Sequence, residues 1–170
     1  METVQELKAY GYEQVEFFMD TSYFAYDRAK VKKLPTLIPH HYIVVNLNKN
    51  GAHFLSEMVK DIKDYLVKWY KVFFVSVSKW FSGEYMDIKY YYKLKNELAE
   101  FETLNLANFT LLDWEYDFPW FVQTLVEAQV VISSRLHLFL ISEFLGVPTK
   151  VYPYQRKILK MQKLMEGMKL

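Results

Sequence analysis

Arg135 and His137 are the residues of this chain whose types and spacing most clearly suggest chemistry. They lie in a short polar junction, SSRLH at 133–137, between an apolar segment at 128–132 and an apolar helical pattern at 136–145. We predict a buried strand for the first segment and a helix for the second, closed by a glycine and a proline. Ligands of open α/β sheets bind just beyond the carboxyl ends of the strands, so an anion would bind at this junction.

The position of Arg135 gives a physical reason to expect an anion there. A cation in the first turn of a helix faces the positive end of the helix dipole, which costs up to ~1 kcal/mol, and it therefore needs a negative partner. The planar guanidinium matches a phosphate or a carboxylate, and helix amides donate to the same oxygens. His137 would bind the anion or transfer a proton. The alternative is that Arg135 pairs with an acidic side chain such as Glu127 or Asp113 and that His137 packs under the next loop.

Tyr154 and Lys157 follow the last predicted strand and therefore belong to the same edge of the sheet. Lys157 would add positive charge against a phosphate, and Tyr154 would offer a hydroxyl or a stacking face. The alternative is a solvated lysine at the start of a helix and a half-buried tyrosine. The sequence leaves both interpretations open.

Three carboxylates, Asp113, Glu115 and Asp117, alternate with aromatic residues after another predicted strand. On an extended chain they share one face, where they would act as a general base or grip a sugar. Alternatively, Asp117 caps the next helix and the others are loop residues. The chain has no cysteine, and the neighbouring His40 and His41 would point to opposite faces of a strand. We therefore expect neither a metal site nor a cofactor.

Composition limits the classes of protein to which the chain can belong. Its 170 residues, 52% of them hydrophobic, suffice for one core of ordinary size. A formal net charge of +1 argues against a nucleic-acid partner. The amino end lacks the apolar core of a signal peptide, and no apolar run reaches the ~18 residues of a membrane span. We expect a cytoplasmic protein.

Segments with strand and helix character alternate from residue 42 onward. The predicted strands are 42–47, 72–77, 109–112, 128–132 and 149–152, and the predicted helices are 54–70, 87–104, 118–127, 136–145 and 156–168. Such repeats form a parallel sheet between two helix layers, so we predict a Rossmann-like three-layer α/β domain over 42–170. We interpret residues 1–41, which end in a basic stretch with two prolines, as the remnant of an N-terminal α/β unit plus a linker.

Three motifs in this order resemble the carboxyl-terminal half of polysaccharide pyruvyl transferases. They are VISSRLH at 131–137, LGVP at 145–148 and YQRK at 154–157. The resemblance implies one domain of a glycosyltransferase B-type fold, in which two Rossmann-like domains face a cleft. It also implies transfer of the enolpyruvyl unit of phosphoenolpyruvate to a sugar, usually as a ketal.

The same resemblance suggests roles for individual residues. MDTSYF at 19–24 is similar to the aspartate segment that closes the amino-terminal domain of the family, and Lys49 stands where members often carry an arginine. The implied catalytic residues are His137 and Asp20. The implied substrate-binding residues are Arg135, Ser134, Lys157, Tyr154 and Lys49.

The resemblance covers only the back half of a typical member, so other functions stay open. We expect the chain to need a partner chain or a second copy to complete the cleft. One alternative is a glycosyltransferase-type domain that binds a nucleotide sugar. Another is a truncated, non-catalytic relic that works by binding or assembly. The basic last helix would also suit peripheral contact with an anionic membrane.

Overall fold

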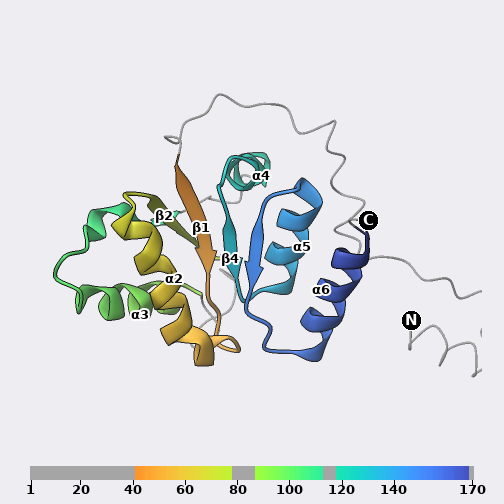
Figure 1. Ribbon diagram of the computed structural model, residues 1–170, viewed down its shortest axis with the longest axis horizontal. Helices are drawn as coiled ribbons and strands as arrows, with labels where there is room; N and C mark the ends of the chain where they lie inside the picture. The colour runs from red at the N-terminus through yellow and green to blue at the C-terminus, as the bar shows by residue number, and fades with distance from the viewer. Residues whose placement is uncertain (1–40, 78–86, 113–117, 169–170) are drawn as a thin grey trace, which may run out of the picture.

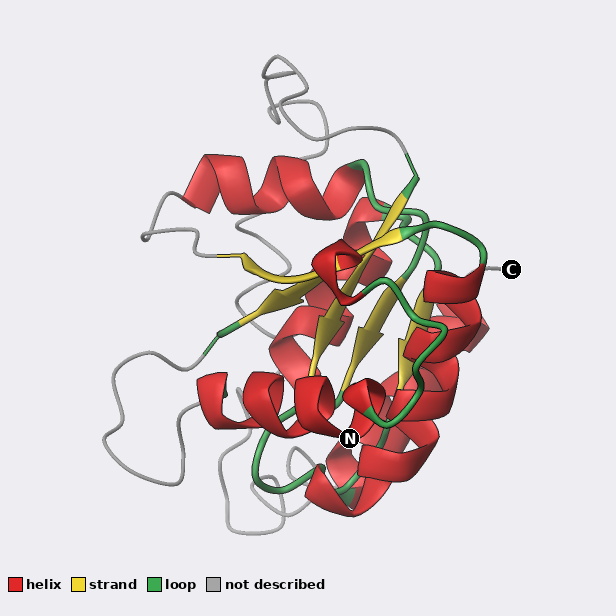
Figure 2. Ribbon diagram, turned by 90° about the vertical axis from the view of Figure 1, so that its left-hand side faces the viewer, coloured by secondary structure: helices red, strands yellow, loops and turns green. Residues whose placement is uncertain are grey.

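A computed structural model describes residues 41–77, 87–112 and 118–168 of the chain. Its five strands form one parallel sheet in the order β3-β2-β1-β4-β5, which confirms the predicted Rossmann-like α/β fold. Figure 2 shows these strands side by side between the helices. The strands are β1 (Tyr42–Asn46), β2 (Lys71–Val75), β3 (Phe109–Leu112), β4 (Val131–Ser133) and β5 (Thr149–Val151).

Helices cover both faces of the sheet, with α2 and α3 on one side and α4, α5 and α6 on the other (Figure 1). Their bounds are α2 (Leu55–Val67), α3 (Ile88–Ala99), α4 (Phe118–Val126), α5 (Leu136–Leu145) and α6 (Arg156–Met168), with short 3-10 turns η3 (Ala52–Phe54) and η5 (Leu106–Asn108). No helix of the described segments is both long and apolar enough to cross a membrane.

The central strand β1 is buried along its whole length because both of its faces are covered. Its alternate residues separate the two cores. Ile43 and Val45 face the cluster under α2 and α3, whereas Tyr42 and Val44 face the cluster under α4 and α5. An unbroken apolar strand of this kind is typical of a parallel sheet covered on both faces.

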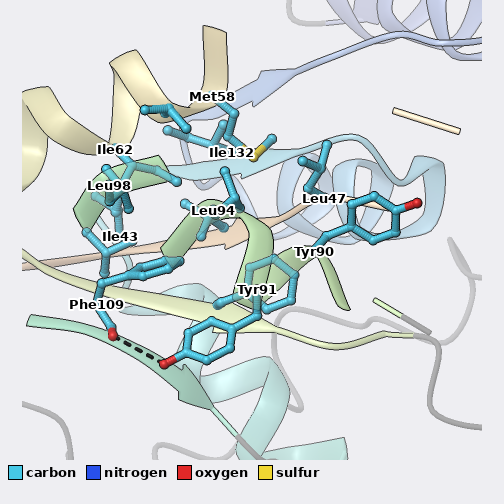
Figure 3. Close-up of a cluster of buried hydrophobic side chains, with 14 of the residues drawn as sticks. Ile43, Leu47, Met58, Ile62, Tyr90, Tyr91, Leu94, Leu98, Phe109 and Ile132 are labelled. Atoms are coloured by element: carbon cyan, nitrogen blue, oxygen red, sulfur yellow. Dashed lines mark hydrogen bonds between the residues drawn. The ribbon is translucent and has the colours of Figure 1, made fainter. Parts of the chain in front are cut away.

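Figure 3 shows the core beneath α2 and α3, where Leu94 and Leu98 of α3 pack close to Ile43 of β1. The hydroxyl of Tyr91 reaches the carbonyl oxygen of Phe109 at 3.5 Å, at the edge strand β3. The helix is therefore held to the sheet mainly by apolar contact.

The order of the strands creates a switch point between β1 and β4. The chain adds β2 and β3 on one side of β1 and then returns to place β4 and β5 on the other side. Asn46, the last residue of β1, is in register with Ser133, the last residue of β4. In sheets of this kind the crevice at the carboxyl end of the switch point is the usual ligand site.

Some predicted boundaries differ from the structure. The strand predicted at 128–132 begins only at Val131, because the amide of Ala128 still bonds back to the carbonyl of Leu125 in α4, although Gln129 and Val130 already bond to β1. The predicted helix 87–104 ends at Ala99, and the predicted strand 72–77 ends at Val75. The interpretation of residues 1–41 lies outside the described residues, His41 excepted.

Candidate functional site

Arg135 begins helix α5 at the carboxyl end of β4. Its backbone is extended, with φ −95° and ψ 130°, and its carbonyl accepts the first helical hydrogen bond, from the amide of Phe139. The amide of Arg135 donates to the hydroxyl of Ser133 at 2.9 Å. The chain therefore turns sharply from strand to helix at this point, and the Arg135 side chain emerges at the switch point.

The guanidinium of Arg135 binds the carboxylate of Asp87 through two hydrogen bonds. Nε donates to Oδ2 at 2.9 Å, and Nη2 donates to Oδ1 at 2.5 Å. The Asp87 side chain is completely buried, whereas 26% of the Arg135 side chain is exposed. Paired, parallel hydrogen bonds of this kind are among the strongest that a side chain makes.

An acidic partner for Arg135 was one of the two interpretations of the sequence, and the structure shows such a partner, but it is not Glu127. Glu127 lies between the end of α4 and the start of β4, at the amino edge of the sheet, and its carboxylate accepts a hydrogen bond from Gln123. Asp113, the other candidate, lies outside the described residues. The acid that pairs with Arg135 is Asp87, from the start of α3.

Asp87 also bonds to the ends of two other strands. Asn46 Nδ2 donates to Asp87 Oδ2 at 3.0 Å and to the carbonyl of Val75 at 2.8 Å. The amide of Val77 donates to Asp87 Oδ2 at 3.1 Å. One buried carboxylate thus connects the carboxyl ends of β1, β2 and β4, and its charge is balanced by hydrogen-bond donors, as burial requires.

The loop after β1 packs tightly against the start of α5. The Ser134 hydroxyl accepts from the amide of Asn48 at 3.0 Å and donates to Asn48 Oδ1 at 3.3 Å. Asn48 Oδ1 also accepts from the amide of Gly51 at 2.8 Å. A β-carbon on Gly51 would lie 2.5 Å from the Ser134 β-carbon, so only glycine lets the loop approach this closely.

The other predicted site residues lie around the same edge, with different exposure. Lys49 is half-buried in the loop after β1, and His137 is exposed in the first turn of α5. Tyr154 is half-buried just before α6, and Lys157 is exposed in its first turn. Asp20 and the carboxylates at 113, 115 and 117 lie outside the described residues. The structure therefore brings Arg135, Ser134 and the loop of Lys49 together at the switch point.

The sequence interpretation missed three polar residues of this site: Asn46, Asn48 and Asp87. All three are buried. Asn46 had a local signal, because it is the one polar residue in the apolar run 42–47. Asp87 directly precedes a helix, where an aspartate usually caps the first turn, but its side chain makes no capping bond there and instead binds Arg135.

The described residues contain no group of three or more histidine, aspartate or glutamate side chains that could hold a metal ion. The groups that the described part of the site offers are hydrogen-bond donors and charges. It presents a partly exposed guanidinium, the start of a helix and exposed basic side chains beside a buried carboxylate. Such donors suit an anionic ligand.

Comparison with known proteins identifies one family. A family model described as "Polysaccharide pyruvyl transferase" matches residues 3–156 of the 170. Searches of curated proteins and of solved structures returned no match. The match spans most of the chain and includes every strand of the sheet, together with the Arg135 junction. This chain therefore belongs to the polysaccharide pyruvyl transferase family.

Proposed function

We propose that this domain holds phosphoenolpyruvate for transfer of its pyruvate unit to a sugar hydroxyl. The observation that carries the proposal is the position of Arg135. Its guanidinium is partly exposed at the carboxyl end of the switch point, within the region that matches the family. Phosphoenolpyruvate has a phosphate and a carboxylate, and a guanidinium can bind either group through paired hydrogen bonds.

Other groups at this edge complete the proposed donor site. Lys157 and Lys49 add positive charge, and the amides at the start of α5 can donate to an anion. Tyr154 contributes a hydroxyl near the end of β5. Ser134 acts indirectly, because its hydroxyl already bonds to Asn48 and so fixes the loop that carries Lys49.

In the proposed transfer, an acceptor hydroxyl oxygen bonds to C2 of the enolpyruvyl unit. C3 gains one proton, and a second hydroxyl of the same sugar then replaces phosphate at C2, which gives a ketal. Of the two hydroxyl protons released, one balances the proton gained by C3 and the other leaves with the phosphate. His137 is our candidate for proton transfer, since it lies exposed two residues after Arg135 and an imidazole can donate or accept a proton. Asp20 is our candidate for a base on the acceptor side, through the family resemblance alone.

We further propose that the basic face of α6 contacts an anionic membrane surface. Arg156, Lys157, Lys160 and Lys163 are exposed on this helix, and Leu159 is 44% exposed among them. Each lysine or arginine near an anionic surface contributes about 1 kcal/mol of attraction. This contact would bring the donor site toward a lipid-linked acceptor.

Two measurements on the purified chain test the proposed donor. A thermal-shift screen compares phosphoenolpyruvate with nucleotide sugars, and we expect phosphoenolpyruvate to stabilise the protein more. A larger shift with a nucleotide sugar would favour the glycosyltransferase-type alternative. Phosphate release is then measured with a panel of sugars, together with the mass of the protein in solution. Release that depends on the sugar supports transfer, whereas donor binding without release supports a binding role alone.

A further inference from the structure

We propose that Asp87 is a positioning residue that turns the guanidinium of Arg135 toward the donor anion. This inference rests on the proposed function, because it concerns how the same site binds its ligand. The guanidinium has two edges that can each bind a carboxylate or phosphate through paired hydrogen bonds. One edge carries Nε and Nη2, and the other carries Nη1 and Nη2.

Asp87 occupies the first edge only. Its oxygens accept from Nε and from one hydrogen of Nη2. Among the residues that the structure describes, none bonds to the second edge, which carries both hydrogens of Nη1 and the other hydrogen of Nη2. Since the Arg135 side chain is 26% exposed and Asp87 is fully buried, the carboxylate holds the arginine from the protein side. The remaining edge is the one that can meet a ligand.

Asp87 is itself held rigidly, which a positioning role requires. It accepts hydrogen bonds from Asn46 Nδ2 and from the amide of Val77. The Asn46 amide group is oriented with its donor toward Asp87 and Val75, although this leaves Asn46 Oδ1 without a hydrogen-bond partner in the part of the chain that the structure describes. A buried, unpaired acceptor is unfavourable, so the arrangement favours a fixed Asp87 over a fully bonded Asn46.

A competing explanation is that Asp87 merely neutralises Arg135. The two explanations predict opposite effects of Asp87→Asn, which removes the negative charge at nearly constant size. If Asp87 only neutralises the arginine, its loss strengthens the binding of every anion. If it orients the arginine, its loss weakens the binding of an anion that needs two groups held in register, despite the gain in net positive charge.

Isothermal calorimetry with phosphoenolpyruvate and with inorganic phosphate distinguishes the two. We expect Asp87→Asn to weaken phosphoenolpyruvate binding about fivefold or more while phosphate affinity changes less than about twofold. Asp61→Asn is the matched control. Like Asp87, Asp61 is a carboxylate that binds a basic side chain and accepts a further hydrogen bond, here from Lys150 and Tyr152, but it lies in the middle of α2. It should leave both affinities unchanged. Tighter or unchanged phosphoenolpyruvate binding in Asp87→Asn, or an equal change for both anions, overturns the proposal.

A second background tests whether Asp87 acts through the arginine. Arg135→Lys keeps a positive charge beside Asp87, so the buried carboxylate stays compensated, but lysine lacks the two-edged fork. In this background Asp87→Asn should cause no further selective loss of phosphoenolpyruvate. A loss as large as in the wild-type background would show that Asp87 acts by another route.

Nitrogen-15 NMR of the arginine side chains gives a test that needs no Asp87 variant. The chain has three arginines, and Arg156 is an exposed reference. We expect the Nε–H of Arg135 to exchange with solvent more slowly than that of Arg156, and inorganic phosphate to perturb its Nη resonances while Nε–H stays protected. Equal exchange at both residues overturns the proposal. If phosphate perturbs Arg135 but phosphoenolpyruvate does not bind, the proposed donor is wrong. The role of Asp87 is then tested by the exchange of Nε–H and by the shifts that phosphate causes at Nη. If neither anion perturbs Arg135, both proposals fail.

Discussion

At the scale of single residues, the site depends on close backbone approach as much as on side-chain chemistry. Gly51 lets the loop after β1 lie directly against Ser134, and that contact holds Asn48 and Lys49 beside the start of α5. Gly51 has φ −88°, a value that any residue adopts, so its requirement is purely one of space. Trp69 is the opposite case, because its side chain has room but its backbone is strained.

Gly51→Ala should destabilise the protein by about 1–3 kcal/mol, because the new β-carbon would lie 2.5 Å from that of Ser134 and would displace the loop. Gly167→Ala is the control. Nothing lies within 4 Å of a β-carbon there, and alanine favours a helix over glycine by about 0.5–1 kcal/mol. Urea unfolding of the two variants checks this, and equal stability of both would contradict it.

Trp69→Gly should stabilise the protein by about 1 kcal/mol, because Trp69 closes α2 with φ 63°, a left-handed conformation that favours glycine. The amides of Trp69 and Tyr70 bond back to Leu66 and Tyr65, as in a Schellman motif. Little packing is lost, since Trp69 is 77% exposed. Trp69→Ala keeps the backbone strain and should not stabilise. Chemical unfolding of both variants distinguishes relief of strain from loss of the indole.

At the scale of elements, the sequence predicted most of the sheet and its helices but not the complete site. The bounds of α5 and α6 were predicted to the residue. The end of α5 is marked by Gly146, which takes the left-handed conformation there, as its position in the sequence indicated. Residues 128–130 were predicted as strand although β4 begins only at Val131; they lead directly into β4, and Gln129 and Val130 already bond to β1. Asp87 was missed because it lies 48 residues before Arg135, and only the order of the strands brings the two together.

Two buried tyrosines predict a loss of stability at alkaline pH: Tyr152, at the contact between α2 and the end of β5, and Tyr42 of β1. Burial, followed by the hydrogen bond to Asp61, raises the pKa of Tyr152 well above its ordinary value of 10.0. Burial, followed by the charge of Glu127, also raises the pKa of Tyr42. The unfolded chain therefore loses these protons near pH 10, before the folded protein does. Their contribution is full below that pH and is lost as the pH rises above it.

We expect the free energy of unfolding to fall between about pH 9 and pH 11, and to fall less steeply in Tyr152→Phe, which cannot ionise there. Tyr92→Phe, at an exposed tyrosine of α3, should keep the slope of the wild type. Urea titrations across this pH range measure the slopes. A Tyr152→Phe slope equal to that of the wild type would contradict the assignment.

At the scale of the whole molecule, the strand order concentrates polar groups at one edge of an otherwise apolar sheet. The ends of β1, β2 and β4 meet at Asp87, while the basic helix α6 follows β5 on the side of α5 (Figure 1). The net charge of the whole chain is only +1, but exposed basic side chains give α6 a local excess of positive charge. Any attraction to an anionic surface should therefore be local and sensitive to salt.

Reversal of charge on α6 tests the proposed membrane contact. We expect the protein to sediment with vesicles that contain phosphatidylserine more than with pure phosphatidylcholine, and Lys160→Glu/Lys163→Glu to abolish the difference. Lys89→Glu/Lys93→Glu, at two exposed lysines of α3, changes the net charge equally and should keep binding. If both pairs reduce binding equally, the attraction comes from net charge and not from α6.

Calorimetric titration with phosphoenolpyruvate tests most directly whether Arg135 holds the donor. The variants are Arg135→Ala, Arg135→Lys, which keeps the buried Asp87 compensated, and Lys157→Ala, with exposed Lys163→Ala as control and circular dichroism to confirm folding. We predict that Arg135→Ala abolishes binding, that Arg135→Lys and Lys157→Ala weaken it, and that Lys163→Ala leaves it unchanged, because only arginine supplies both the charge and the paired hydrogen bonds. Wild-type affinity in a folded Arg135→Ala protein would contradict the account.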